Sequence, residues 1–192
     1  LHPRVRRQRQ MCIRDSKYTV VIEKGSPGAC RGAVSGGRGK TLIMFSDDLD
    51  KALATFVLAN GAAATGEKVT IFFTFWGLNV IKKVHKPKVE KDIFGRMFSM
   101  MLPSSSLRLK LSKMHMLGIG SRMMRHIMKI RGIESLEALR DQALAQGVEF
   151  IACQMSMDVM GVKREELLDD VTVGGVATYM ERAEEANVNL FI

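Results

Sequence analysis

The sequence predicts an α/β protein of three layers, in which helices cover both faces of a five-stranded, mainly parallel sheet. From Thr41 onward, short continuous apolar runs alternate with segments of helical periodicity. This alternation is typical of parallel strands joined by right-handed crossover helices. The runs are apolar at nearly every position, as expected for strands buried on both faces. We therefore expect one domain over residues 41–192, interrupted by a Met-rich basic insertion at about 85–131.

The predicted elements follow one another closely on both sides of the insertion. Before it, we expect a strand at 41–46, a helix at 47–66 with an acidic first turn, a strand at 68–75 and a short helix at 76–84. After it come a helix at 135–147, a strand at 148–153, helical pieces at 155–161 and 163–170, a strand at 171–173, a helix at 174–187 and a strand at 188–192. One face of the first helix should carry Leu49, Leu53, Phe56, Val57 and Asn60.

The residues upstream of Thr41 do not form a domain by themselves. Residues 1–16 contain five arginines and no periodicity, and they resemble a translated sequencing adapter; the alternative is a disordered basic arm. Residues 17–25 predict one strand, which cannot be stable alone. A Gly-rich linker follows and ends near residue 40, and Cys30 lies within it.

The positive charge of the chain is concentrated in two places. The formal net charge is +9, and residues 1–40 hold ten Lys and Arg against two acidic residues. Residues 82–131 hold 13 basic and two acidic residues, so the remainder of the domain is acidic. With Phe94 and Phe98 as the aromatic residues of this stretch, base stacking has little support, and we expect no nucleic-acid partner.

The cysteine content indicates a reduced, cytoplasmic protein. The three cysteines, Cys12, Cys30 and Cys153, are odd in number, widely spaced and form no CxxC pair. No sequence window is apolar enough over about 18 residues to predict a spanning helix. The acids at Asp47, Asp48 and Asp50 suit a helix start, so we expect no metal site and no cofactor.

Cys153 is the candidate reactive residue because it ends a predicted strand immediately before a predicted helix. Ligands of parallel α/β sheets bind at the carboxyl ends of the strands. Amides at the start of a helix favour thiolate over thiol. The alternative is that Cys153 is a small buried hydrophobe, and position alone does not separate the two.

The run "CQMSMDVMGV" at 153–162, together with residues 45–83, resembles the DsrE/DsrF-like sulfurtransferase family, in the subgroup often labelled DsrE family or peroxiredoxin family. The spacing of Cys153 and Gly161 matches the family pattern, and the resemblance covers residues 40–192. It implies that Cys153 carries a persulfide and passes sulfur between partner thiols. In longer relatives this module follows CoA-disulfide-reductase, rhodanese and TusA-like domains. The strand at 17–25 is similar to the last strand of a TusA-like domain.

A persulfide on Cys153 would need hydrogen-bond donors for its negative charge, and the resemblance implies partners that exchange sulfur. Backbone N–H groups of Gln154, Met155 and Ser156, and a turn at Gly174 and Gly175, would hold a negative persulfide. For Ser156 the alternative is an N-cap, and for the glycines a tight turn with positive φ. Cys30 is a candidate resolving thiol, the alternative being a linker residue without a role. Expected partners are rhodanese-like and TusA-like donor and acceptor proteins.

Two other functions stay open at this stage. The chain would be a sulfur-trafficking adaptor if Cys153 were inert and the insertion docked partners. A thiol peroxidase is the weaker alternative, because no local threonine or arginine motif accompanies the cysteine. The insertion itself holds eight methionines among its cations, which suits a self-association or partner interface, or contact with a membrane surface.

Overall fold

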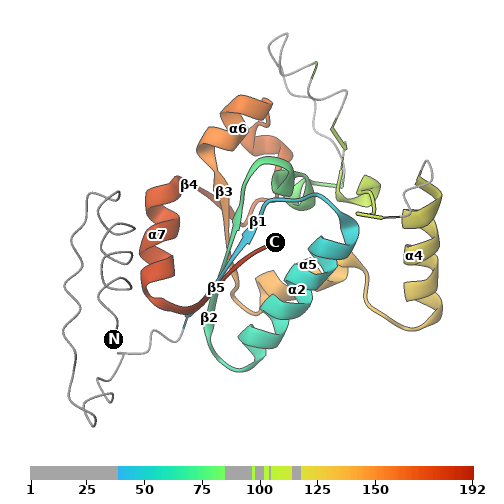
Figure 1. The fold of residues 1–192 in the computed structure, drawn as a ribbon, viewed down its shortest axis with the longest axis horizontal. Coiled ribbons are helices and arrows are strands. Elements are labelled where there is room, and N and C mark those ends of the chain that lie inside the picture. Colours follow the sequence, from blue (N-terminus) through green and yellow to red (C-terminus); the bar gives the residue numbers. More distant parts are fainter. Residues whose placement is uncertain (1–38, 85–96, 98–101, 104, 114–117) are drawn as a thin grey trace, which may run out of the picture. The chain divides into compact units, whose positions relative to one another are not determined.

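The domain is built on a single sheet of five parallel strands in the order β4-β3-β2-β1-β5. The structure is a computed structural model and describes residues 39–84, 97, 102–103, 105–113 and 118–192 (Figure 1). The strands are β1 (Gly39–Met44), β2 (Lys68–Phe73), β3 (Glu149–Cys153), β4 (Val171–Gly174) and β5 (Ala186–Phe191). Because every pairing is parallel, the carboxyl ends of all five strands meet at one edge.

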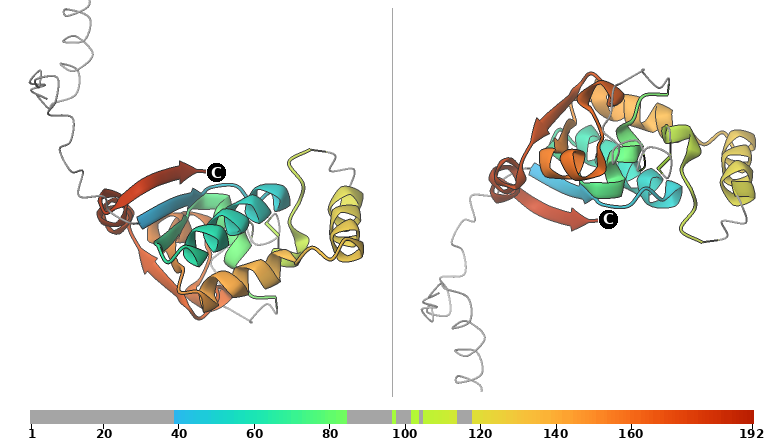
Figure 2. Two further views of the ribbon diagram at one scale, coloured as in Figure 1. Left: turned by 90° about the horizontal axis from the view of Figure 1, so that it is seen from below. Right: turned by 90° about the horizontal axis from the view of Figure 1, so that it is seen from above.

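Helices lie on both faces of this sheet, which gives the three predicted layers (Figure 2). Helices α2 (Leu49–Ala64) and α5 (Leu136–Ala145) pack against each other on one face. Helix α7 (Val176–Glu184) lies on the other face. The remaining helical elements are α4 (Ile119–Ile130), α6 (Gln154–Met160) and the 3-10 turns η1 (Phe75–Ile81), η2 (Ser106–Arg108) and η4 (Arg164–Glu166).

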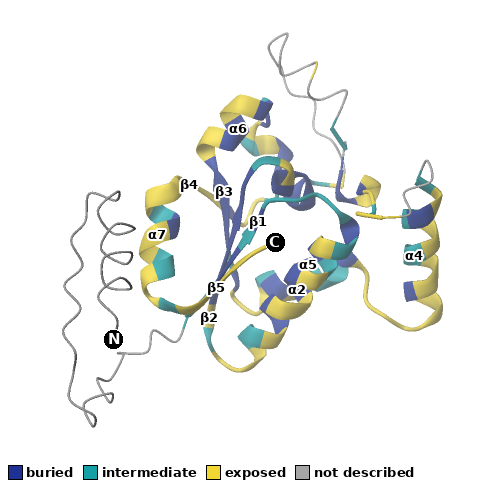
Figure 3. Ribbon diagram, viewed as in Figure 1, coloured by how far each residue is buried: buried dark blue, intermediate teal, exposed yellow. Residues whose placement is uncertain are grey.

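The main core lies between the sheet and the α2–α5 layer. Its largest members are fully buried aromatic side chains from α2, β2 and β3, namely Phe56, Phe73 and Phe150. Their ring centroids are 5.3 to 6.4 Å apart, within the range in which aromatic pairs attract. A smaller cluster on the α7 face contains Cys153. The edge strand β5 is exposed along most of its length (Figure 3).

The predicted fold class and the order of strands and helices are confirmed, with three local differences. Residues 163–170 form only the single turn η4, and residues 75–81 form a 3-10 helix rather than an α-helix. Val57 is 58% exposed, so it does not belong to the core face of α2. The strand expected at 17–25 and Cys30 lie outside the described residues, as does much of the insertion.

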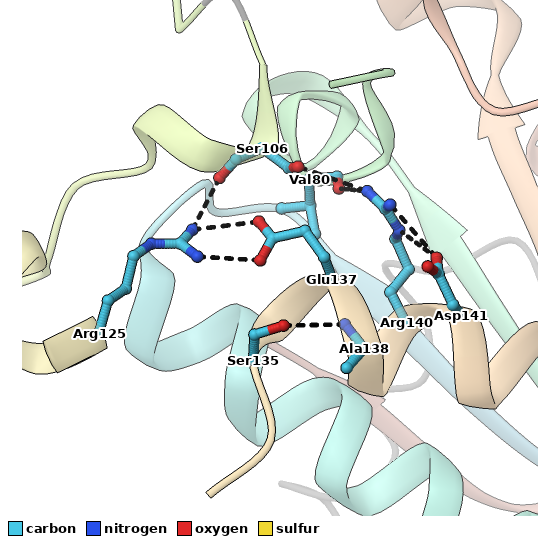
Figure 4. Close-up of polar contacts among 8 residues, drawn as sticks. All are labelled: Val80, Ser106, Arg125, Ser135, Glu137, Ala138, Arg140 and Asp141. Carbon is cyan, nitrogen blue, oxygen red and sulfur yellow. Dashed lines mark hydrogen bonds and ion pairs between the residues drawn. The ribbon is translucent and has the colours of Figure 1, made fainter. Parts of the chain in front are cut away.

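A polar network ties the described part of the insertion to α5 (Figure 4). Arg125 of α4 donates to both carboxylate oxygens of Glu137, at 2.9 and 3.2 Å, and to the Ser106 carbonyl at 3.0 Å. Arg140, 3% exposed, donates at 3.4 Å to the Val80 carbonyl and to the Ser106 hydroxyl. The fork of Arg125 fixes α4 in both position and direction, because a bidentate pair constrains geometry as well as energy.

Replacing Glu137 by glutamine is expected to destabilise the domain by about 1–2 kcal/mol at neutral pH, since it leaves a half-buried guanidinium without its counter-charge. Burial raises the pKa of Glu137, but the hydrogen bond and charge of Arg125 outweigh it, so the net pKa lies below its usual value. The contribution of the Arg125–Glu137 ion pair to the free energy of unfolding is therefore complete above the unfolded-state pKa of Glu137, and it is lost as pH falls through the folded-state pKa. Urea denaturation at several pH values should show the difference between wild type and variant narrowing in acid.

Asp169→Asn is the matched control, because Asp169 pairs with Lys83 but its side chain is 86% exposed. Exposed pairs of this kind contribute little, so this change should fall within experimental error. A Glu137→Gln effect that did not narrow in acid would contradict the assignment to the ion pair.

Candidate active site

The carboxyl edge of the sheet brings Cys153 together with residues at the ends of two other strands, β4 and β2. Cys153 is the last residue of β3, as the sequence predicts, and it is also the N-cap of α6. In the sheet register it lies opposite Gly174, the last residue of β4. Thr74 follows β2 at the same level, because Phe73 pairs with Ala152. Alternating strand residues place Cys153 and Ile151 on the α7 face.

The side chain of Cys153 is buried, which agrees with the alternative that it is a small buried hydrophobe. It is 1% exposed and belongs to an apolar cluster with Phe72, Ile151 and Tyr179. The Tyr179 ring lies 5.2 Å from the Phe72 ring, and its hydroxyl lies 3.3 Å from the Thr41 hydroxyl. Tyr179 therefore anchors α7 over the sheet, and any reaction at the sulfur requires local opening of this cover.

Removing the ring of Tyr179 should open that cover. In Tyr179→Ala, we expect Cys153 to react with an aromatic disulfide reagent at least about tenfold faster than in wild type, because an open state becomes more populated. Stopped-flow absorbance measures the rate in protein that lacks Cys12 and Cys30. Two changes should leave the rate near that of wild type: Tyr179→Phe, which keeps the ring, and Met180→Ala, at a 53% exposed neighbour. An unchanged rate in Tyr179→Ala would show that another element covers the sulfur.

The three residues after Cys153 lie in quite different environments. Gln154 is exposed and donates to Asp158 at 2.8 Å, while Met155 is 51% exposed. Ser156 is fully buried. The predicted N-cap role for Ser156 is wrong, because the helix starts one residue after Cys153 and Ser156 is its third residue.

Sequence reasoning missed the partner of Ser156. The hydroxyls of Thr74 and Ser156 lie 2.8 Å apart in a buried contact between the end of β2 and α6. This contact joins the element that carries Cys153 to the neighbouring strand. The sequence offered one indication of this contact: Thr74 follows an apolar strand, so it is expected at the same edge of the sheet as Cys153 and the helix after it.

Gly174 and Gly175 serve different purposes, and neither has the positive φ that a tight turn would require. A Cβ on Gly174 would lie 3.0 Å from the Ile151 side chain and 3.3 Å from Thr178, so a larger residue would require these side chains to shift. Gly175 is the N-cap of α7 and has φ of −98°. A Cβ there would meet nothing within 4 Å. The open space at Gly175 leaves its backbone accessible at the carboxyl edge.

The three carboxylates after β1 each have a partner within the protein. Asp47 accepts a hydrogen bond from the buried Asn79 at 3.0 Å, and burial raises the pKa of its carboxyl group. Asp48 pairs with Lys51 at 2.7 Å, and Asp50 accepts from the Ser112 amide at 3.0 Å. Within the described residues, no group of three or more His, Cys, Asp or Glu side chains is arranged to hold a metal ion.

Sequence comparison decides the family. Residues 38–191 match the DsrE/DsrF/DrsH-like family. The chain belongs to this family. An uncharacterized protein of Bacillus subtilis, YrkE, is 45% identical over 152 residues, which are 79% of this chain and 95% of that protein. The sulfur carrier protein DsrE2 of Allochromatium vinosum is 36% identical over 155 residues, covering 79% of this chain and 96% of the relative. The solved YchN protein from E. coli covers 80% of this chain and 99% of its own, at 12% identity and a TM-score of 0.48.

The DsrE-like domain also carries an aromatic cluster at the same carboxyl edge. Phe45 follows β1, and its ring centroid lies 5.5 Å from those of Phe75 and Trp76 and 5.8 Å from that of Phe191. Trp76 is 45% exposed and Phe191 is 68% exposed. Sequence reasoning did not group these residues, because they come from the ends of three different strands.

Proposed function

We propose that this DsrE-like protein carries sulfur on Cys153 and passes it from a donor persulfide to an acceptor thiol. The observation that supports this proposal is the position of Cys153 at the carboxyl edge, where it ends β3 and caps α6. It is the free cysteine of the described part of the chain. The relative named as a sulfur carrier gives the position a chemical context.

The proposed cycle consists of two thiol exchanges and needs no oxidant. The Cys153 thiolate attacks the outer sulfur of a donor persulfide, the donor S–S bond breaks, and the donor leaves as a thiolate. An acceptor thiolate then attacks the outer sulfur on Cys153. The new acceptor persulfide forms as the Cys153–sulfur bond breaks, which returns the Cys153 thiolate. Backbone amides of Gln154, Met155 and Ser156, with the accessible backbone near Gly175, would hold the charged persulfide.

The burial of Cys153 makes transfer a gated reaction in this proposal. Tyr179 of α7 packs in the cluster that contains Cys153, so opening of α7 would expose the sulfur in this proposal. The Thr74–Ser156 contact joins α6, which begins next to Cys153, to the end of β2. Docking of a donor or acceptor would favour the open state.

The proposed partners are rhodanese-like and TusA-like proteins. We also propose that the domain associates with itself and that the protein is cytoplasmic, where thiols stay reduced. We further propose that residues 17–25 are the last strand of a TusA-like domain in a longer multidomain protein, and that a Gly-rich linker up to residue 40 joins it to the DsrE-like domain.

Mass spectrometry tests the relay directly. A variant with Cys12→Ser and Cys30→Ser retains Cys153 alone and should gain the mass of one sulfur atom after incubation with glutathione persulfide. Adding Cys153→Ser should abolish the gain, and an acceptor thiol should remove it from the parent variant. A parent that never acquires sulfur would overturn the relay. A sulfur adduct that persists in the parent, but that is released as hydrosulfide with formation of a Cys30–Cys153 disulfide when Cys30 is restored, would assign Cys30 the resolving role.

A non-catalytic adaptor is the second candidate, and the burial of Cys153 favours it. In that case the cysteine is a core residue, and Cys153→Ala would leave partner binding unchanged. Pull-down with a TusA-like protein, performed beside the mass measurement, separates the two functions. Binding without any sulfur adduct supports the adaptor.

A further inference from the structure

Helix α4 has apolar residues on two faces: one face packs against the protein, and the other carries an apolar stripe that is exposed to solvent. Ile119, Met123, Ile127 and Ile130 recur at spacings of four, four and three residues, so they share one helix face. They are 60%, 46%, 43% and 68% exposed, respectively. We call these four residues the outer stripe.

The opposite face of α4 already has its contacts. Met128 is 6% exposed, Met124 packs against the main core, and Arg125 pairs with Glu137. The outer stripe is therefore not the face that anchors the helix. Figures 1 and 2 show α4 standing at the side of the domain, away from the sheet, and Figure 3 shows its outward side as exposed. The stripe is thus a surface on which another molecule can be placed without disturbing the core.

Cations lie beside the stripe. By helical geometry, Arg122 and Lys129 fall along one border of the apolar face, and both are exposed. Long cationic side chains at such a border can keep their stems on apolar surface while their charges reach phosphate groups. In the sequence, the segment 82–131 that contains this helix holds 13 basic and two acidic residues. A second copy of the chain would meet this charge with charge of the same sign.

We propose that α4 docks the protein on an anionic lipid surface, lying in the plane of the headgroups with the outer stripe among the acyl chains. An amphipathic helix with a cationic border is typical of interfacial binding. Helix α4 spans only 12 residues, and among the described helices none is long and apolar enough to cross a bilayer. The charges attract the protein to anionic lipid, and the stripe supplies apolar burial once it arrives. The cations beside the outer stripe complement anionic headgroups, and the stripe itself is exposed. Both features favour a lipid surface over a groove in another protein as the partner.

Vesicle sedimentation of the full chain tests this proposal. The protein should sediment with phosphatidylcholine vesicles that contain phosphatidylglycerol, and not with phosphatidylcholine alone. Ile119→Ser, Ile127→Ser and Ile130→Ser combined should lower the partition coefficient at least about tenfold, because three apolar side chains lose their burial. Arg122→Ser with Lys129→Ser should lower it roughly fivefold for each charge.

The control alters a comparable apolar pair elsewhere. Val57 and Leu58 on α2 are 58% and 47% exposed, and changing both to serine should leave sedimentation unchanged. Circular dichroism checks that each variant keeps its helices; if the triple variant unfolds, Met123→Ser with Ile130→Ser replaces it.

Three outcomes would overturn the proposal. Sedimentation that survives the stripe changes would assign lipid binding to other basic residues, such as those at 1–16. The stripe would be an interface between copies of the chain if the protein did not sediment with vesicles and light scattering showed a dimer that the stripe changes dissociate. If the wild type does not bind vesicles but binds polyglutamate, and the stripe variant loses that binding, the partner of the stripe would be an acidic protein instead.

Discussion

Replacing Gly77 by alanine is expected to destabilise the domain by about 3 kcal/mol or more, because there is no room for a side chain. A Cβ at this position would lie 2.0 Å from the carbonyl oxygen of Met44 and 2.7 Å from its carbonyl carbon. Both are backbone atoms at the end of β1, so no rotamer change can relieve the clash. The Gly77 amide also donates to the Phe45 carbonyl at 2.9 Å, and the displaced turn would lose that bond.

Gly61→Ala is the matched control for this change. Gly61 lies inside α2, and a Cβ there would meet nothing within 4 Å. Alanine restricts the unfolded chain and should stabilise the helix by about 0.5–1 kcal/mol. Urea denaturation of both variants should therefore give changes of opposite sign. A Gly77→Ala variant as stable as wild type would mean that η1 does not approach β1 this closely.

Truncating Phe73 to alanine is expected to cost about 3–5 kcal/mol, the range for a large aromatic side chain in a closed core. Phe73 is fully buried on β2, with its ring 5.3 Å from Phe150 and 6.4 Å from Phe56. The three rings come from β2, β3 and α2, so the cavity would open where the sheet meets the helical layer. Because these elements are rigid, the cavity should close only in part.

The control for Phe73→Ala is Val57→Ala on α2, where the side chain is 58% exposed. That change should alter the free energy of unfolding by no more than about 0.5 kcal/mol. Guanidinium denaturation with matched slopes gives both values. A small loss in Phe73→Ala would place the core of the domain elsewhere.

The sequence predicts the fold well where one physical signal dominates. In the buried parallel strand Lys68–Phe73, four of the six residues are apolar and every residue after Lys68 is buried, as expected for a strand covered on both faces. The helix predicted at 163–170 is wrong, because acidic residues and leucines are also compatible with a turn that is held by side-chain hydrogen bonds. The Arg164 guanidinium donates to the carbonyls of Leu168, Asp169 and Val171, and these bonds replace a helical ladder.

The candidate site was predictable in position but not in environment. A cysteine between a strand and a helix must lie at the carboxyl edge of a parallel sheet, whatever the remaining sequence does. Its burial depends on Tyr179, which arrives from another element through tertiary packing. The Thr74–Ser156 contact joins residues 82 positions apart, and a single sequence has no local signal for such a pair.

The apolar cover over Cys153 has a consequence for chemical damage. Peroxide converts an accessible thiolate to sulfenic acid and then, irreversibly, to sulfinic acid. With the side chain 1% exposed, solvent oxidants would reach the sulfur only in the fraction of molecules that is transiently open. The lifetime of the thiol under oxidative stress would then be set by the opening equilibrium of the cover that Tyr179 of α7 provides, rather than by the intrinsic reactivity of the sulfur.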